Sequence, residues 1–285
     1  MRLLLYDYLK LLISIKNLGV LKNNFLFLSS ISSIFLLVIA CVTTTTSTTT
    51  DTSKSKNTTT KDGRQVVVRK AGTLQVVEPD TIRLEPDPYS ALVEMDTKFG
   101  TMKIELFFDA ENHRANFIKL ANQHYYDSLM FHRVMKNFMA QGGDPNSRKA
   151  KKGQRLGNGG PNYKQDAEIG QHYYHVKGAL AAARQPDEMN PEKRSSGAQF
   201  YIVHGSSVSP GQLDKNERKY NIIYTEDQRK LYYKLGGAPQ LDMEYTVFGR
   251  VYERLDIIDS ICLKETDAYA RPKEDIRVKV RVIQE

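Results

Sequence analysis

The sequence contains little cysteine and lacks the short motifs that mark several enzyme classes. Its two cysteines, Cys41 and Cys262, are too few for a disulfide framework. No G-x-S-x-G or H-E-x-x-H stretch occurs, which argues against the hydrolases and zinc proteases that these motifs identify. Residues 157–160 (GNGG) lack the strand–turn–helix setting of a phosphate loop. We therefore expect a reaction that needs no cofactor.

A metal-ligand pattern is also missing. His172 and His175 have a spacing that a metal site could use, but the sequence offers no third ligand to go with them. Zinc sites need at least three protein ligands. No metal is predicted.

One apolar run near the amino terminus bears on where the protein is located. The run over residues 25–40 is shorter than the ~20 residues of a spanning helix, and the lysines before it are typical of a signal peptide. It ends in Val38-Ile39-Ala40-Cys41, which resembles a bacterial lipobox. We predict a signal peptide over residues 1–40 and a lipid on Cys41. The mature protein would then face the periplasm or the surface in a bacterial cell envelope. The alternative is a short membrane anchor that is never cleaved.

The next segment, residues 41–90, is predicted to be a tether. Threonine fills 11 of the 21 positions from 42 to 62, and so polar a stretch cannot bury enough surface to offset its chain entropy. Valines at 66–68 and 76–77 allow short strands, but Pro79, Pro86 and Pro88 favour an extended connector. The remaining residues, 91–285, have the length of one domain.

Charge adds one open question. The chain has a formal net charge of +8, and part of the excess lies between Arg148 and Arg155. This stretch is either a solvated loop or a patch that meets anionic lipid headgroups or acidic polypeptides. The basic residues have no aromatic residues interleaved with them, so nucleic acid is not a predicted partner.

Alternation and helical spacing predict a mostly β domain. Strands are expected over 91–97 and 101–106, around Arg133, Met139, Leu180, Phe200 and Phe248, and over 276–283. Helices are expected over 110–123 and from Leu255 to Cys262, where Cys262 is a buried small hydrophobe. A third helix over 224–235, with Thr225 as N-cap and Gly236-Gly237 as its stop, falls in residues 206–239.

The most informative stretch is residues 131–144 (FHRVMKNFMAQGGD). If 131–134 and 138–141 are strands, alternation puts Phe131 and Arg133 on one face and Met139 and Gln141 on one face. Such a surface offers one cation, one amide and apolar area, with no nucleophile–base pair. It suits a reaction in which no covalent bond breaks. Gly142 and Gly143 indicate a bend beside the strand.

These residues resemble the signature of the cyclophilins, the peptidyl-prolyl cis-trans isomerases. Further blocks follow in the family's order: 159–163 (GGPNY), 178–184 (GALAAAR), 195–203 (SSGAQFYIV), and Leu241-Asp242 with 246–251 (TVFGRV). The resemblance covers residues 92–285. It implies an eight-stranded antiparallel barrel capped by two α-helices, to which residues 206–239 add a helical insertion. That insertion either shapes the choice of substrate or braces a loop.

The resemblance also implies roles for individual residues. Arg133 matches the essential arginine, and Gln141 matches the amide that binds the substrate backbone. Residues matching the wall of the proline pocket are Phe138, Met139, Tyr201 and Leu241. Residues matching the strand that pairs with the substrate are Ala183, Arg184 and Gln185. Gln199 shares a face with Tyr201 and lines the same groove, while Phe200 turns into the core.

The chain departs from the family pattern at three positions. Many members have phenylalanine where this chain has Tyr201, and the added hydroxyl makes the pocket smaller or more polar. Tyr245, also expected to bind substrate, stands where the family often has histidine, and Gln240 stands where it often has tryptophan. The missing tryptophan at Gln240 argues against tight cyclosporin binding. The segment from His175 to Gly178 resembles the family's structural turn, which is the alternative to a metal ligand at His175.

Three classes of function remain open at this point. The first is an active isomerase, working as a monomer on proline-containing polypeptides that have been exported. The second is a module that binds proline segments without useful turnover. The third is a lipoprotein in which the barrel is only a scaffold. Acceleration of isomerisation in a short proline peptide separates the first from the other two.

Overall fold

The computed structural model describes residues 58–59, 65–66, 85–170 and 173–285. The chain divides into two units, residues 1–79 and 80–285. In the first unit, β1 (Thr58–Thr59) pairs antiparallel with β2 (Gln65–Val66). The predicted signal peptide, Cys41 and most of the predicted tether lie outside the described residues. Among the residues described, no helix combines the length and apolar character needed to span a membrane.

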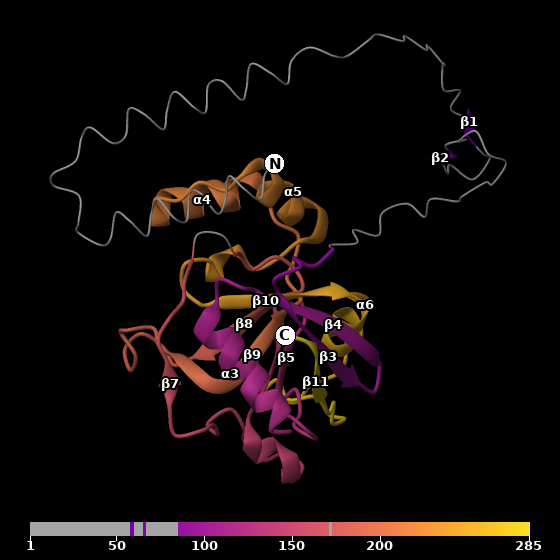
Figure 1. The fold of residues 1–285 in the computed structure, drawn as a ribbon, viewed down its shortest axis with the longest axis vertical. Helices are drawn as coiled ribbons and strands as arrows, with labels where there is room; N and C mark the ends of the chain where they lie inside the picture. The colour runs from indigo at the N-terminus through magenta and orange to yellow at the C-terminus, as the bar shows by residue number, and fades with distance from the viewer. Residues whose placement is uncertain (1–57, 60–64, 67–84, 171–172) are drawn as a thin grey trace, which may run out of the picture. The chain divides into compact units, whose positions relative to one another are not determined.

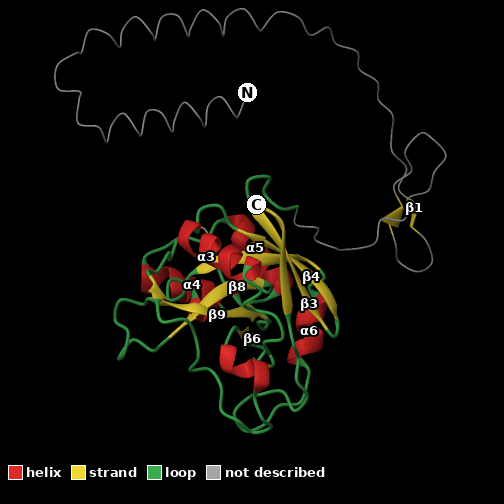
Figure 2. Cartoon of the chain, turned by 60° about the horizontal axis from the view of Figure 1, so that its bottom comes forward, coloured by secondary structure: helices red, strands yellow, loops and turns green. Residues whose placement is uncertain are grey.

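The second unit is built on one antiparallel sheet (Figures 1 and 2). Its strands are β3 (Ala91–Thr97), β4 (Gly100–Leu106), β5 (Arg133–Met135), β6 (Met139–Gly142), β7 (Lys164–Gln165), β8 (Ala179–Arg184), β9 (Ser195–Val203), β10 (Val247–Glu253) and β11 (Lys279–Gln284). They run in the order β11-β3-β4-β10-β8-β9-β6-β5, and β7 pairs with β9 at the side. Eight strands thus form the main path, as predicted, and β7 is an additional short one.

The path is an open half-barrel whose two ends are joined by short flanking segments. Phe131 N–H donates to the carbonyl of Ile276 at 3.0 Å, and Val278 N–H donates to the carbonyl of Leu129 at 2.8 Å. Met130 and Arg277 form an antiparallel bridge between them. These contacts lie just before β5 and just before β11.

Alternating side chains place one face of each strand in the main core. In β3, Ala91, Val93 and Met95 are fully buried while their neighbours are partly exposed. This is the pattern of a strand with one covered face. In β9 both faces are covered: Phe200 and Ile202 belong to the main core, whereas Tyr201 and Val203 belong to a second apolar cluster. The predicted inward turn of Phe200 is confirmed.

Two helices cover the sheet as predicted. The helix α3 (Glu111–Asn122) contacts β9, β10 and β11, and α6 (Asp256–Cys262) contacts β4, β5 and β6. The buried residues of α3 have the spacing of one helix face, and they place Phe117, Leu120 and Ala121 in the main core. Cys262 is 2 % exposed and packs in the same core, which confirms its assignment as a small hydrophobe.

The insertion contains one predicted helix and one that was not predicted. The predicted helix is α5 (Glu226–Leu235), which begins after Thr225 with a capping box and ends at Gly236. The unpredicted helix is α4 (Pro210–Tyr220), followed by the short 3-10 helix η2 (Pro239–Leu241). In Figure 1, α4 and α5 lie side by side at one end of the sheet. Their apolar faces build a third cluster that contains Leu213, Tyr224 and Tyr232.

One strand prediction is wrong. Strand pairing begins at Arg133, not at Phe131. Phe131 is 1 % exposed in the main core, whereas Arg133 is exposed on the opposite side. The alternation fails because Phe131 hydrogen-bonds to Ile276 before the chain enters β5. Phe131 and Arg133 therefore do not share a face. Met139 and Gln141 lie within β6 (two residues apart), as the alternation requires.

Candidate active site

The predicted wall residues come together in one apolar cluster. Met139 and Tyr201 form its buried part, at 2 % and 5 % exposure. Phe138, Leu241 and Tyr245 pack against them and are partly exposed. We call these five residues the apolar wall. Its members come from the β5–β6 turn, β6, β9, η2 and the segment just before β10, so the wall exists only after the sheet has formed.

A row of polar side chains runs beside the apolar wall. Strand pairing sets Arg133 opposite Gln141, and Gln141 opposite Tyr201. The Arg133 Nη1 lies 3.4 Å from Gln141 Oε1, a weak hydrogen bond. Gln141 Nε2 donates to Gln199 Oε1 at 3.0 Å. Arg133, Gln141 and Gln199 thus lie on one surface, with the arginine exposed at its end.

The row is held in place by a loop and a buried carboxylate. Gln199 Nε2 donates to the carbonyl oxygens of Gly157 and Gly159 at 2.9 and 2.6 Å. Asp144, which is 0 % exposed, accepts from the backbone N–H groups of Gly157 and Asn146. Asp144 therefore fixes the loop that orients Gln199.

Gly143 allows the close approach that this arrangement needs. Its φ is +91°, a left-handed value that favours glycine. A Cβ atom at this position would lie 2.2 Å from the Ala198 carbonyl oxygen. The predicted bend beside the strand is confirmed.

The side chains of residues 183–185 differ in exposure and contacts. Arg184 is 4 % exposed in its side chain. Its Nε donates to the Glu244 carbonyl at 2.8 Å, and its guanidinium lies 4.5 Å from the centre of the Tyr245 ring. Gln185 is exposed and accepts from Lys164. Ala183 belongs to the same apolar cluster as the wall. Arg184 thus supports Tyr245 from behind.

Tyr201 is the polar member of the buried wall. Its hydroxyl lies 2.9 Å from His175 Nε2, and His175 Nδ1 lies 2.9 Å from Asp242 Oδ1. Burial, with Tyr245 and Asp242 nearby, raises the pKa of Tyr201 well above its ordinary value. The phenol therefore stays protonated and is available as a donor at neutral pH.

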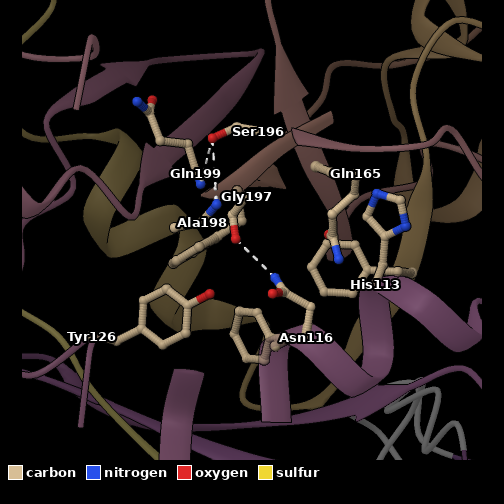
Figure 3. A pocket seen from close by; sticks show the side chains of 12 residues that line it. His113, Asn116, Tyr126, Gln165, Ser196, Gly197, Ala198 and Gln199 are labelled. Atoms are coloured by element: carbon tan, nitrogen blue, oxygen red, sulfur yellow. Dashed lines mark hydrogen bonds between the residues drawn. The ribbon is translucent and has the colours of Figure 1, made fainter. Parts of the chain in front are cut away.

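A small pocket between α3 and β9 is a separate feature (Figure 3). There Asn116 donates to the Gly197 carbonyl at 2.8 Å, and Ser196 Oγ accepts from the backbone of Gln199. No residue of the apolar wall lines it, and Gln199 is the one predicted site residue that does. This pocket is not the candidate active site.

No group of three His, Cys, Asp or Glu side chains gathers as metal ligands in the part of the chain that the structure describes. His175 instead bonds Asp242 and Tyr201, and His172 lies outside the described residues.

The sequence analysis gave no role to Asp144 or Asp242, and it placed His175 only in a structural turn. All three stand within or next to the matched blocks, and all are at most 1 % exposed. A carboxylate inside a glycine-rich motif was the available signal for Asp144, because a buried charge needs several donors.

The chain belongs to the cyclophilin-type peptidyl-prolyl cis-trans isomerases, an enzyme family whose model matches residues 92–282. The prediction made from the motif blocks is thereby confirmed for fold and class.

Two bacterial relatives illustrate the relationship. A Streptococcus pyogenes protein, provisionally named a bifunctional phosphatase/peptidyl-prolyl cis-trans isomerase, is 33 % identical over 195 residues. That alignment covers 66 % of this chain and 37 % of the relative, so the chain spans little more than a third of that protein. A Staphylococcus saprophyticus protein, provisionally named a peptidyl-prolyl cis-trans isomerase, is 30 % identical over 188 residues, or 65 % of this chain and 87 % of the relative.

Among solved structures, a Cryptosporidium parvum cyclophilin type peptidyl-prolyl cis-trans isomerase has a TM-score of 0.49 and 24 % identity. The match covers 69 % of this chain and 99 % of that one.

Proposed function

We propose that the chain accelerates rotation about X-Pro peptide bonds by electrostatic stabilisation from Arg133. The observation that carries this proposal is the position of Arg133 at the exposed end of a polar row, next to an apolar wall. A proline ring would pack on Phe138, Met139, Tyr201, Leu241 and Tyr245. Gln141 would bind the substrate backbone, and the backbone of residues 183–185 would pair with the residues before the proline.

The energetics fit such a site. Rotation about a peptide bond has a barrier of about 18–20 kcal/mol because resonance stiffens the C–N bond. X-Pro bonds populate both isomers and exchange in tens to hundreds of seconds. Exchange in milliseconds requires the barrier to fall by roughly 5.5–7 kcal/mol. A guanidinium aimed at the proline nitrogen favours the twisted state, in which conjugation is lost, and apolar surroundings strengthen that interaction.

The test is the isomerisation rate of a short proline peptide with Arg133→Ala. We expect at least a hundredfold lower kcat/KM, about 2.7 kcal/mol in barrier, with unchanged thermal unfolding because Arg133 is exposed. Arg133→Lys should recover only part of the rate, because an ammonium lacks the planar fork. Arg254→Ala is a matched control: Arg254 is an exposed arginine that pairs with Asp256 beside α6. Near-normal turnover in Arg133→Ala would refute the mechanism.

We place this activity outside the cytoplasm, in the bacterial cell envelope. The support is the sequence over residues 25–41, an apolar run that ends in Ala40-Cys41. Its clients would be exported polypeptides that contain proline, and the protein would act as a monomer tethered through lipid on Cys41.

Mass spectrometry of the mature amino terminus tests the tether. We expect a lipid mass on Cys41 and its loss, with release from membranes or retention of the precursor, in Cys41→Ser. An unmodified Cys41 inside a longer mature chain would refute this assignment.

A further inference from the structure

A buried carboxylate joins the insertion to the apolar wall. Asp242, directly after Leu241, is 0 % exposed. Its Oδ1 accepts from the backbone N–H of His175 at 2.8 Å and faces the ring Nδ1 at 2.9 Å. Its Oδ2 accepts from the hydroxyls of Tyr224 and Tyr232, each at 2.6 Å. Four donors therefore satisfy one buried carboxylate, and two of them belong to the insertion.

The other end of this network reaches the wall. Because a carboxylate only accepts, the hydrogen bond to Asp242 requires a hydrogen on Nδ1 of His175. In the tautomer that carries its hydrogen there, Nε2 accepts from the Tyr201 hydroxyl, 2.9 Å away. The hydroxyl hydrogen of Tyr201 is thus committed to the buried His175. We call Tyr224, Tyr232, Asp242, His175 and Tyr201 the relay.

A second contact from the insertion supports the neighbouring ring. Tyr220, the last residue of α4, donates to Glu244 Oε1 at 2.6 Å. Arg184 Nη2 lies 3.4 Å from Glu244 Oε2, and the same guanidinium stacks on Tyr245. The rings of Tyr245 and Tyr201 meet edge to face, with centroids 5.8 Å apart. Both helices of the insertion therefore contact residues that fix an aromatic side chain of the wall.

We infer that the insertion is a specificity element, and that Tyr224 and Tyr232 act as positioning residues that set the Tyr201 side chain through Asp242 and His175. This inference rests on the proposed isomerase function and adds to it. Loss of one insertion hydroxyl leaves the carboxylate short of a donor, so Asp242 and His175 shift toward the remaining partners. The Tyr201 hydroxyl is then no longer held, and the wall changes shape where the proline ring packs.

A relay that only stabilises the fold would behave differently. It would lower the unfolding temperature of a variant while leaving KM and the order of substrate preference unchanged. To distinguish the two roles, kinetics must therefore be measured with substrates whose cyclic residue differs in ring size. Suitable probes are matched peptides that contain proline or its six-membered analogue, pipecolic acid.

The experiment compares Tyr232→Phe with Tyr233→Phe. Both remove one hydroxyl from α5 without changing the ring, but Tyr233 is 45 % exposed and its hydroxyl accepts from Arg229 of the same helix. We expect Tyr232→Phe to raise KM for the proline peptide and to change the proline-to-pipecolate ratio by about threefold or more, with kcat much less affected. Tyr233→Phe should match the wild type.

A double-mutant cycle makes the test specific. In a Tyr201→Phe background the relay has no hydroxyl to position, so the added change Tyr232→Phe should leave KM and the substrate ratio as they are. Additive effects in the double variant would overturn the inference, as would equal kinetics of Tyr232→Phe and wild type. The ¹⁵N signals of His175 give a second measurement, expected to show hydrogen on Nδ1 and to change at Nε2 in Tyr201→Phe.

The two proposals fail in distinguishable ways. A wild-type protein that does not accelerate isomerisation would refute the proposed function. In that case the double-mutant cycle would use peptide affinity, measured by NMR titration, in place of KM. An active wild type with additive variants would refute the relay alone.

Discussion

Acidification should destabilise the domain through His132, which is buried directly before Arg133. His132 is 4 % exposed. Burial lowers its pKa to about 4, and the nearby Arg133 and Arg271 add to this effect against the opposing charge of Asp144. The ordinary histidine pKa is about 6.5. The unfolded chain therefore binds the proton first, and stability is lost as the pH falls from about 6.5 toward 4.

The magnitude follows from these two pKa values. At pH 5 the unfolded histidine is almost fully protonated and the folded one mostly neutral, so the linkage amounts to about 2 kcal/mol relative to pH 7.5. At pH 4 it approaches about 3 kcal/mol. His132 thus contributes fully above pH 6.5, and its contribution has largely disappeared by pH 4.

Urea unfolding at pH 7.5 and pH 5 measures the effect. The wild type should lose about 2 kcal/mol more than His132→Gln, whose side chain does not titrate. Comparing the loss of stability between the two pH values in the two proteins cancels the cost of the substitution at neutral pH. It also cancels the contributions of other titrating groups. An NMR titration of the His132 ring in the folded protein should place its midpoint near pH 4. Parallel stability curves for the two proteins would refute the reasoning.

Two further predictions concern packing. Gly143→Ala should destabilise the domain by at least about 3 kcal/mol, seen as a lower unfolding temperature, because its Cβ would lie 2.2 Å from the Ala198 carbonyl oxygen; unchanged unfolding would contradict the close approach. Burial raises the pKa of the Cys262 thiol to about 12, so Ellman's reagent at pH 8 should label it no faster than the domain unfolds. Rapid labelling of the folded protein would show that the thiol is accessible.

The parts of the fold that could be predicted are those set by local pattern. The β3–β4 hairpin, α3, α6 and α5 all carry their own signals: alternation, helical spacing, or a cap and a stop. The helix α4 has such signals too, since Ser209 and Gln212 form a capping box around Pro210. Its mostly polar surface offered little apolar periodicity, and that is why the pattern did not identify it.

The residues of the site could be predicted from the sequence, but the hydrogen bonds and packing contacts between them could not. Arg133, Gln141 and Gln199 share one surface, and the five wall residues pack together. The partners of Asp242 could not be read from the sequence, because Tyr224 and Tyr232 reach it through tertiary packing of the insertion. Arg184 illustrates the same limit: its side chain folds over Tyr245 in a way that no periodicity encodes.

The joining of the two ends of the sheet has a consequence for how the protein is made. β11 pairs with β3, and the segment before it pairs with the residues that lead into Arg133. Pairings so distant in sequence form late, and these cannot form until residue 284 has left the ribosome. Until then the nascent chain lacks the strand that completes one side of its sheet, and the isomerase domain cannot reach its final fold.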